Sequence, residues 1–285
     1  MQCGARARGS RAIRDEPPDG ARRLRYVVSV SDSQRLLAAD EPPAFEIVNP
    51  HGRSRAVLLC DHASRRIPRA LGDLGLTDEQ LRDHIAWDIG AAVMARAAAR
   101  ALDATLILSG YSRLVIDCNR PLENATSIPE VTGGVEVPGN RGLTESQRRS
   151  RAEACFFPYH RAIESVLAAR TEKVAIVSMH SFTPRPLSGP RPWHAAMVYG
   201  RDRSLGGLLF DALRHDEGLV LGDNEPYRVT DAGDYGIPVY AERAGRPGVL
   251  IEIRQDQIDD DTRAEAWGKR LAEAYAGIEG KLFSE

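Results

Sequence analysis

Long apolar runs and closely spaced cysteines are both missing from this sequence. No stretch approaches the roughly 18 apolar residues that a membrane-spanning helix needs, and the four cysteines among 285 residues form no CxxC pair. Cys60 and Cys118 lie within apolar stretches, which indicates buried free thiols and a reducing compartment. The net charge of -2 creates no field that would attract nucleic acid or an acidic membrane. We therefore expect a cytoplasmic protein that binds neither nucleic acid nor a membrane, in an oligomeric state that stays open.

Apolar periodicity is also scarce at the N-terminus. Residues 1–43 are rich in Arg, Gly and Pro, and they lack the apolar core of a secretory signal. Asp15, Glu16 and Asp19 argue against an acid-poor transit peptide. We expect residues 1–43 to be a disordered extension, or the product of a start codon placed too far upstream. Residues 44–285 show no internal repeat and no linker, so we expect a single domain there.

What the sequence does contain, from about residue 44 onward, is a series of short apolar runs bounded by polar residues. Such runs are typical of strands that are covered on both faces. The predicted strands are residues 56–60, 104–110, 113–117, 173–179, 194–200 and 248–253. Helical patterns separate most of these runs, so the sequence predicts an α/β fold with a mostly parallel sheet and helices on both faces.

The helix signals lie between the apolar runs and after the last one. Thr77 and Gln80 have the spacing of a capping box, and residues 90–102 are Ala-rich. Residues 144–170 read as a long helical region that Pro158 must break or kink. An apolar stripe then recurs every three or four residues at Ala264, Trp267, Leu271, Tyr275, Ile278 and Leu282. This stripe predicts a C-terminal helix that docks on the sheet.

Polar side chains follow or interrupt four of the apolar runs. They are Asp61 and His62, then Asp117, Asn119 and Arg120, then His180 and Ser181, and finally Glu252 and Arg254. In folds of this class, catalytic groups gather beyond the carboxyl ends of the strands. A single His at such a place is often only a hydrogen-bonding residue. Two histidines accompanied by carboxylates indicate a metal site, and zinc favours imidazole and carboxylate ligands.

Glu252 is unusual because it stands between Ile251 and Ile253 in an apolar run. Burying an ionised carboxylate is costly unless something requires it there. Glu252 therefore either forms a structural ion pair with Arg254 or Arg243, or serves as a general base that takes a proton from an attacking water.

Arg113 and Arg120 flank the carboxylate of Asp117. A guanidinium offers a planar fork that suits bidentate binding of a carboxylate, and Asn119 adds an amide donor beside it. Structural pairing with Asp117 is the alternative. Taken with the metal and base candidates, these residues predict a hydrolase for an amide bond in a small acidic substrate.

Eight segments carry a resemblance to a known family. They are "CDHASRRIP", "HIAWDIGA", "YSRLVIDCNRP", "EVPGNRGL", "MHSFTP", "RPWH", "GDNEPY" and "EIRQD". In order and spacing they resemble the N-formylglutamate amidohydrolase family, over almost everything after the unusual N-terminus. That family is similar in fold to zinc carboxypeptidases and succinylglutamate desuccinylases. The resemblance therefore implies a three-layer α/β/α sandwich with a mostly parallel mixed sheet.

The resemblance also implies roles for particular residues. His62 and His180 correspond to the two zinc histidines, Asn119 and Arg120 to the pair that binds the substrate carboxylate, and Glu252 to the catalytic base, with Arg254 as a further substrate-binding residue. We expect Arg113 to stabilise the negative charge that develops on the acyl oxygen.

The acidic zinc ligand does not carry over directly. The relatives place it three residues after the first histidine, where this sequence has Arg65. We predict Asp88 as the replacement, although Asp88 could instead cap the Ala-rich helix. His84 precedes Asp88 by one helical turn, so in a continuous helix it could share the metal or bond to a ligand. Asp61 is the other candidate, but as the neighbour of His62 it is expected to point away.

The function that these expectations favour is a zinc-dependent amidohydrolase. Its substrate would be a small acidic N-acyl amino acid, and N-formylglutamate, cleaved to formate and glutamate, is the one that the resemblance implies. Two alternatives stay open. The same fold and metal could act on another N-acyl amino acid or a peptide terminus, or the protein could bind an acidic metabolite without catalysis.

Overall fold

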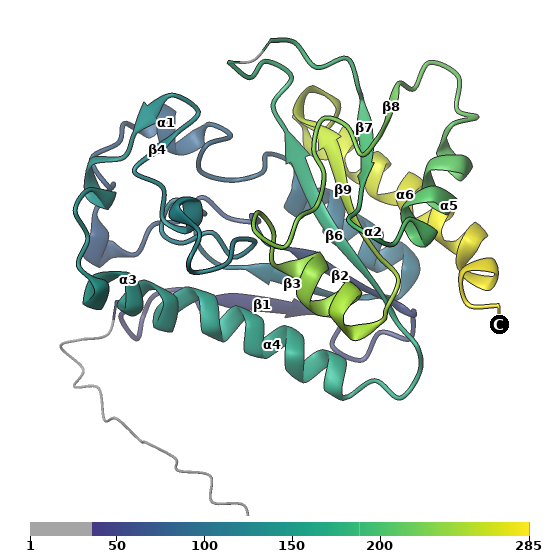
Figure 1. Cartoon of the computed structure of the whole chain (residues 1–285), viewed down its shortest axis with the longest axis horizontal. Coiled ribbons are helices and arrows are strands. Elements are labelled where there is room, and N and C mark those ends of the chain that lie inside the picture. The colour runs from purple at the N-terminus through teal and green to yellow at the C-terminus, as the bar shows by residue number, and fades with distance from the viewer. Residues whose placement is uncertain (1–35, 188, 285) are drawn as a thin grey trace, which may run out of the picture.

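A seven-stranded sheet forms the centre of the computed structural model, which describes residues 36–187 and 189–284 (Figure 1). The strands are β1 (Phe45–Val48), β2 (Ala56–Cys60), β3 (Thr105–Ser109), β6 (Ala175–Phe182), β7 (Ala195–Val198), β8 (Leu221–Asp223) and β9 (Gly248–Arg254). They are ordered β1-β3-β2-β6-β9-β7-β8. The four central strands are parallel, whereas β1 runs antiparallel to β3 and β7 antiparallel to β9. The predicted mostly parallel, mixed sheet is confirmed.

Helices cover both faces of this sheet and complete three layers (Figure 1). One face carries α2 (Ala91–Leu102), α5 (Ser204–Leu213) and α6 (Asp261–Leu282). The other carries α4 (Phe157–Ala168) and a π-helical turn, Ile237–Ala241. The predicted apolar stripe of the C-terminal helix lies in the core. Helices α2 and α6 cross so closely that a Cβ on Gly268 would stand 2.3 Å from the carbonyl oxygen of Met94, so only glycine fits there.

The remaining elements lie at one end of the sheet. They are α1 (Asp78–Arg82), the hairpin strands β4 (Val131–Thr132) and β5 (Val135–Glu136), α3 (Glu145–Arg151) and a π-helical turn, Ala152–Phe156. The predicted capping box of Thr77 and Gln80 starts α1. Pro158 stands in the first turn of α4. The long helical region is not broken there but runs on from α3 through the π-helical turn, which lies just ahead of Pro158.

Residues 113–115 form a turn and residues 116–117 have no regular structure, so the predicted strand there is wrong. The side chains of Leu114 and Val115 are fully buried, but they pack in clusters beside the sheet. Their carbonyl oxygens accept hydrogen bonds from the side chains of Asn140 (2.9 Å) and Arg151 (3.0 Å), in place of a strand neighbour. A short apolar run indicates burial, but it does not say what covers the backbone.

One strand runs further than expected, and this places a site residue differently. β6 ends at Phe182, so His180 lies within the strand and not after it, whereas Glu252 lies within β9 as expected. Of the proposed extension at residues 1–43, residues 1–35 lie outside the described residues, and the single domain from residue 44 stays a prediction. Among the described helices, none combines the length and apolarity that crossing a membrane requires.

Candidate metal centre and active site

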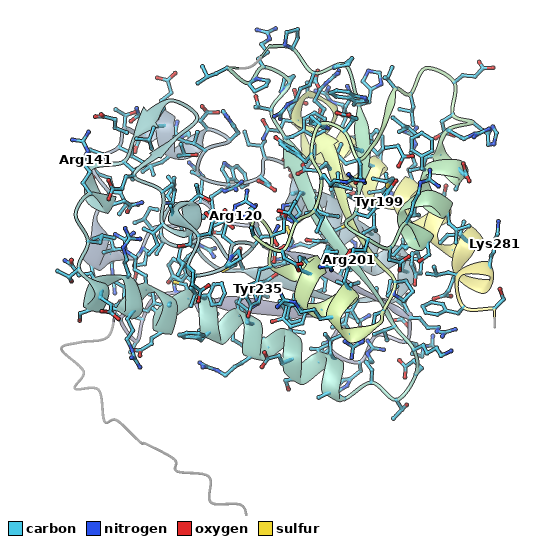
Figure 2. All side chains as sticks on the ribbon, in the orientation of Figure 1. Arg120, Arg141, Tyr199, Arg201, Tyr235 and Lys281 are labelled. Atoms are coloured by element: carbon cyan, nitrogen blue, oxygen red, sulfur yellow. The ribbon has the colours of Figure 1, made fainter. Side chains whose placement is uncertain are left out.

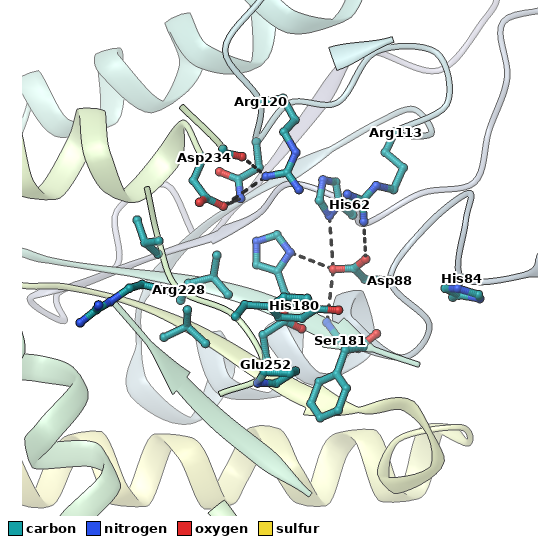
Figure 3. A pocket seen from close by; sticks show the side chains of 18 of the residues that line it. His62, His84, Asp88, Arg113, Arg120, His180, Ser181, Arg228, Asp234 and Glu252 are labelled. Atoms are coloured by element: carbon teal, nitrogen blue, oxygen red, sulfur yellow. Dashed lines mark hydrogen bonds and ion pairs between the residues drawn. The ribbon is translucent and has the colours of Figure 1, made fainter. Parts of the chain in front are cut away.

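A cavity of about 590 Å³ opens where β2, β6 and β9 approach their carboxyl ends. Its lining comes from segments spread over most of the chain, because the central strands are parallel and end at the same edge of the sheet. The predicted site residues in this lining are His62, Asp88, Arg113, Asn119, Arg120, His180 and Glu252. Figure 3 shows His62, Asp88 and His180 converging in its middle.

His62 directly follows β2, which carries its buried imidazole to the edge of the sheet. Its Nδ1 lies 3.3 Å from Oδ2 of Asp88. Its Nε2 lies 2.7 Å from Oδ1 of Asp117. A carboxylate on Nε2 fixes the ring and its tautomer, so that Nδ1 faces the cavity.

His180 repeats this arrangement from the neighbouring strand β6. Its Nδ1 lies 2.8 Å from Oδ2 of Asp88, and its Nε2 lies 3.1 Å from Oδ2 of Asp61. Asp61 is itself held by the hydroxyl groups of Tyr159 (2.9 Å) and Ser178 (2.8 Å). Asp61 thus supports a histidine from behind, and it points away from the centre, as expected of the neighbour of His62.

Asp88 joins the two imidazoles from the segment between α1 and α2. Its Oδ2 also accepts a hydrogen bond from the backbone N–H of Ser181 (3.2 Å). The helix-capping alternative is wrong, because α2 begins after Gly90 and has no side-chain cap. His84 does not share a helix with Asp88, since α1 ends at Arg82. Its ring bonds to Asp83 (2.7 Å) and stands apart from the centre (Figure 3).

These three residues form a donor set that fits a divalent metal ion. If each neutral imidazole directs its single N–H from Nε2 to the carboxylate behind it, both Nδ1 lone pairs face a carboxylate oxygen of Asp88. The two Nδ1 atoms and the carboxylate oxygen of Asp88 are then all acceptors with no proton between them. Their lone pairs repel one another unless a cation lies between them. The ligand atoms of His62, Asp88 and His180 all lie within 4.8 Å of one another, and all three residues are buried. Two imidazoles and one carboxylate are a common catalytic zinc set.

The charges around the centre point the same way. Burial would raise the pKa of Asp88, but the imidazoles of His62 and His180 outweigh it and hold that pKa below its usual range. Burial would lower the pKa of His180, but its hydrogen bonds to Asp61 and Asp88 raise it well above the usual value. The cluster therefore attracts cations, and a metal ion would compete with protons for it.

Glu252 lies beside the metal-ligand candidates. It is the Cα partner of His180 in the parallel pair β6–β9, so the two side chains share one face of the sheet about 5 Å apart. Its Oε2 is buried and has no hydrogen-bond partner among the described residues. Burial raises the pKa of Glu252 to about 7. The ion pair with Arg254 or Arg243 is therefore wrong, and the side chain has the environment of a proton acceptor.

Arg113 lies at the opposite side of the centre, on the turn segment after β3. Its Nη2 donates to Oδ2 of Asp117 (2.8 Å), and its Nη1 lies 3.5 Å from Oδ1 of Asp88. Burial would lower the pKa of this guanidinium, but Asp117 and Asp88 outweigh it and raise the pKa. Arg113 is thus a fixed positive charge at the cavity wall.

Asn119 and Arg120 follow on the same segment, and both bond to the segment 233–236. The Oδ1 of Asn119 accepts the backbone N–H groups of Tyr235 (3.1 Å) and Gly236 (3.0 Å). Arg120 donates to the carbonyl of Gly233 and lies 3.3 Å from Asp234. Figure 2 shows Arg120 in the middle of the molecule, whereas Arg141 and Lys281 lie at its periphery. Asn119 therefore holds two segments together beside the cavity.

Arg254 is placed differently from the prediction. Its guanidinium bonds to both carboxylate oxygens of Asp256 (2.7 and 3.2 Å). Its Nη1 also donates to the carbonyls of Arg191, Pro192 and Trp193. Arg254 lies outside the cavity lining that the described residues form, and its assignment to substrate binding stays a prediction. It ties the segment before β7 to the end of β9.

Sequence reasoning missed several residues that shape the cavity. Asp234 holds Arg120 and Asn119 from the far side, and Tyr227 and Arg228 form part of the wall. Asp61 and Asp117 support the two imidazoles. The sequence contained one sign of this support, which is that Asp61 directly precedes His62. A carboxylate at that position can reach a histidine on the neighbouring strand, and Asp61 does contact His180. Nothing in the sequence marks Asp234.

Comparisons with known proteins identify a family and several solved structures that this chain resembles. A model of the N-formylglutamate amidohydrolase family matches residues 54–258. A gene product of Agrobacterium tumefaciens has a similar crystal structure, with a TM-score of 0.82 and 32% identity over 86% of this chain and 100% of that chain. An N-formylglutamate amidohydrolase from Ralstonia eutropha JMP134 has a TM-score of 0.60 and 18% identity, over 83% of this chain and 100% of that chain. A metallo-carboxypeptidase from Pseudomonas aeruginosa has a TM-score of 0.38 and 11% identity, over 84% of this chain and 61% of that chain. No curated protein sequence matches significantly.

Proposed function

Since the chain belongs to the N-formylglutamate amidohydrolase family, we propose that it is a zinc-dependent enzyme that hydrolyses the linear amide of a small N-acyl amino acid. N-formylglutamate, cleaved to formate and glutamate, is the substrate that the family indicates. The observation that carries the proposal is the convergence of His62, Asp88 and His180 beside the unpartnered carboxylate of Glu252 in one cavity. The free buried thiols of Cys60, Cys118 and Cys155 favour a reducing compartment such as the cytoplasm.

The three ligands proposed for zinc are Nδ1 of His62, Nδ1 of His180 and a carboxylate oxygen of Asp88. A zinc ion held there would supply Lewis-acid chemistry, which would lower the pKa of a water toward ~7 and polarise the acyl carbonyl. Asp117 and Asp61 hold the Nε2 atoms of the two imidazoles and keep both rings turned toward the ion.

Glu252 is the proposed general base. Glu252 lines the cavity, and its buried Oε2 has no competing partner among the described residues, so the carboxylate is free to accept a proton from the attacking water. The raised pKa, about 7, suits a group that takes a proton and then passes it to the departing nitrogen. The transfer leaves Glu252 ionised for the next cycle.

The substrate is held by charges on the other side of the centre. Arg120 is the proposed partner of the carboxylate of the amino acid, and Asn119 and Asp234 fix its orientation. Arg113 is held by Asp117 and Asp88, and we assign to it the stabilisation of the negative charge that develops on the acyl oxygen.

Metal analysis and amide hydrolysis test this proposal together. We expect the purified protein to bind about one zinc ion and to hydrolyse N-formylglutamate, in a screen that also contains N-acetyl and N-succinyl amino acids. The variant His62→Ala should lose the metal. The variant Glu252→Gln should keep the metal and lose at least about 100-fold in kcat, because only the proton acceptor is removed.

Glu279→Gln is a matched control, since Glu279 also has a buried oxygen without a partner among the described residues but lies in α6. It should keep both metal and activity. A folded protein that binds acidic metabolites without zinc and without turnover would instead identify a non-catalytic binding protein and overturn the proposal.

A further inference from the structure

Three guanidinium groups line the cavity, and they differ in what they contact. Arg113 is paired with Asp117 and Asp88, and Arg120 with Asp234 and Gly233. Arg228 is exposed and contacts neither a carboxylate nor a carbonyl within the described part of the chain. Its charge is therefore available to a ligand. In Figure 3, Arg228 lies on the opposite side of the His180 ring from Arg113 and His84.

The cavity wall between Glu252 and Arg228 is apolar. Leu250 precedes Glu252 by two residues in β9, so its side chain lies on the same face of the sheet, about 7 Å along the strand. Val198 is the Cα partner of Leu250 on β7, and Val229 directly follows Arg228 in the chain. All three apolar side chains are buried and line the cavity. These side chains give the cavity an apolar wall between the proposed base and the segment that carries Arg228.

The segment that carries Arg228 is anchored at the cavity. Val229 is only 4% exposed, and the backbone N–H of Thr230 donates to Oδ2 of Asp234 (3.0 Å). On the other side of Arg228, the ring of Tyr227 lies 4.7 Å beneath the guanidinium of Arg191. The Cα of Arg228 is thus held in place, while its guanidinium stays free to reach a ligand.

We propose that Arg228 is a specificity-determining residue, which selects substrates whose amino acid has an acidic side chain. This inference rests on the proposed function, with the α-carboxylate bound at Arg120. The methylene groups of the side chain then lie against Leu250, Val198 and Val229, and the terminal carboxylate pairs with Arg228. An amide at the same position accepts and donates hydrogen bonds but carries no charge for the guanidinium to stabilise.

N-formylglutamate and N-formylglutamine test this assignment, because they have nearly the same size and shape and differ in the charge and the hydrogen bonding of the side-chain terminus. We expect the wild-type protein with zinc to prefer the glutamate compound by about 10- to 100-fold in kcat/KM, mainly through KM. In Arg228→Met this preference should fall toward one, and in Arg228→Lys a part of it should return. Calorimetric binding of both compounds to the zinc-loaded Glu252→Gln variant provides a second readout that needs no turnover.

Arg185→Met is the matched control. Arg185 is an exposed arginine after β6 that lies outside the described cavity lining, so its loss changes the net charge equally and should leave the preference intact. A preference that persists unchanged in Arg228→Met overturns the inference while the proposed function stands. Tight binding of the glutamate compound without any turnover overturns the proposed function, and the binding preference then decides the role of Arg228. If the protein neither binds nor hydrolyses the two compounds, the proposed function and the role of Arg228 are both overturned.

Discussion

His62, His160 and His180 are the buried histidines of the described chain, and their partners set them apart. His62 and His180 each have carboxylates at both ring nitrogens. His160 has only neutral partners, the hydroxyl of Tyr240 (2.9 Å) and the carbonyl of Cys118 (3.0 Å). Burial lowers the pKa of His160 to about 4, whereas the carboxylates raise the pKa of the other two. The same side chain is thus a structural group in one place and a cation-seeking group in another.

His160 makes the stability of the protein depend on pH. Its pKa is about 4 in the folded state and about 6.5 in the unfolded state, so between these values the unfolded state binds more protons. The free energy of unfolding should therefore fall as the pH drops from about 6.5 to 4. In His160→Gln the amide keeps a donor and an acceptor but does not titrate. At pH 4.5 the wild type should lose on the order of 2 kcal/mol more than the variant, relative to pH 7.

Urea unfolding of the metal-free proteins at both pH values measures this difference. The metal is removed with a chelator because the proposed ligands also titrate in this range. Equal pH dependence in the wild type and in His160→Gln would show that His160 is not the group responsible.

Among single residues, the sequence identified those that are polar or charged while their neighbours in the chain are apolar. His62, His180 and Glu252 interrupt or follow apolar strands, so their types alone drew attention to them. The contacts of Arg254 could not be predicted, because its partners are the carbonyls of residues 191–193, some sixty positions away. Arg228 was missed because an exposed arginine in a loop has no distinguishing pattern.

The segment between β3 and the hairpin β4–β5 carries Arg113, Asn119 and Arg120, and its regular structure is limited to one 3-10 turn, Ala125–Ser127. Side chains hold it instead. Asn140 donates to the carbonyls of Leu114 (2.9 Å) and Pro129 (2.8 Å). The fully buried Arg151, at the end of α3, donates to Val115, Gly139 and Oδ1 of Asn140. Two polar side chains therefore replace the ladder that a strand would have had.

Replacing Arg151 should destabilise this segment. In Arg151→Met the acceptors on Val115, Gly139 and Asn140 lose their donor inside the core, and each unsatisfied group is costly. We expect the free energy of unfolding to fall by about 2 to 4 kcal/mol in urea titrations. Arg149→Met, on an exposed position of the same helix, should stay within about 0.5 kcal/mol of the wild type. Equal stability of Arg151→Met and the wild type would contradict this role.

The sequence predicted those helices and strands whose apolar pattern repeats over neighbouring residues. The core strands, the capping box of α1, the Ala-rich α2 and the stripe of α6 follow from nearby residues. The short strands β1 and β8 were missed, because four or three residues carry too little pattern to stand out. The false strand at 113–117 arose because burial by a helix and loops gives the same apolar run as burial in a sheet.

For the whole molecule, strand order decides which residues meet. β2, β6 and β9 are neighbours in the sheet although they are far apart in the chain. Their parallel direction brings His62, His180 and Glu252 to one edge, and the segment before α2 adds Asp88. The rule that parallel strands gather chemistry at their carboxyl ends made a shared site predictable. The order of the strands in the sheet could not be predicted, because buried strands have the same apolar pattern in any order.

Removal of the metal should therefore weaken the fold as a whole, since the proposed ligands join the end of β2, the segment before α2 and the strand β6. A ligand that binds only the folded state stabilises it by about 2.7 kcal/mol at a free concentration one hundred times its dissociation constant. For a chain of this size that corresponds to a rise in Tm of roughly 5 to 10 °C, measured by calorimetry with zinc against chelator. His180→Ala should lose this rise. His84→Ala should keep it, because His84 lines the cavity but bonds to Asp83. A zinc-dependent rise that survives in His180→Ala would place the metal elsewhere, because an ion that does not need this imidazole cannot be held by the three segments that meet here.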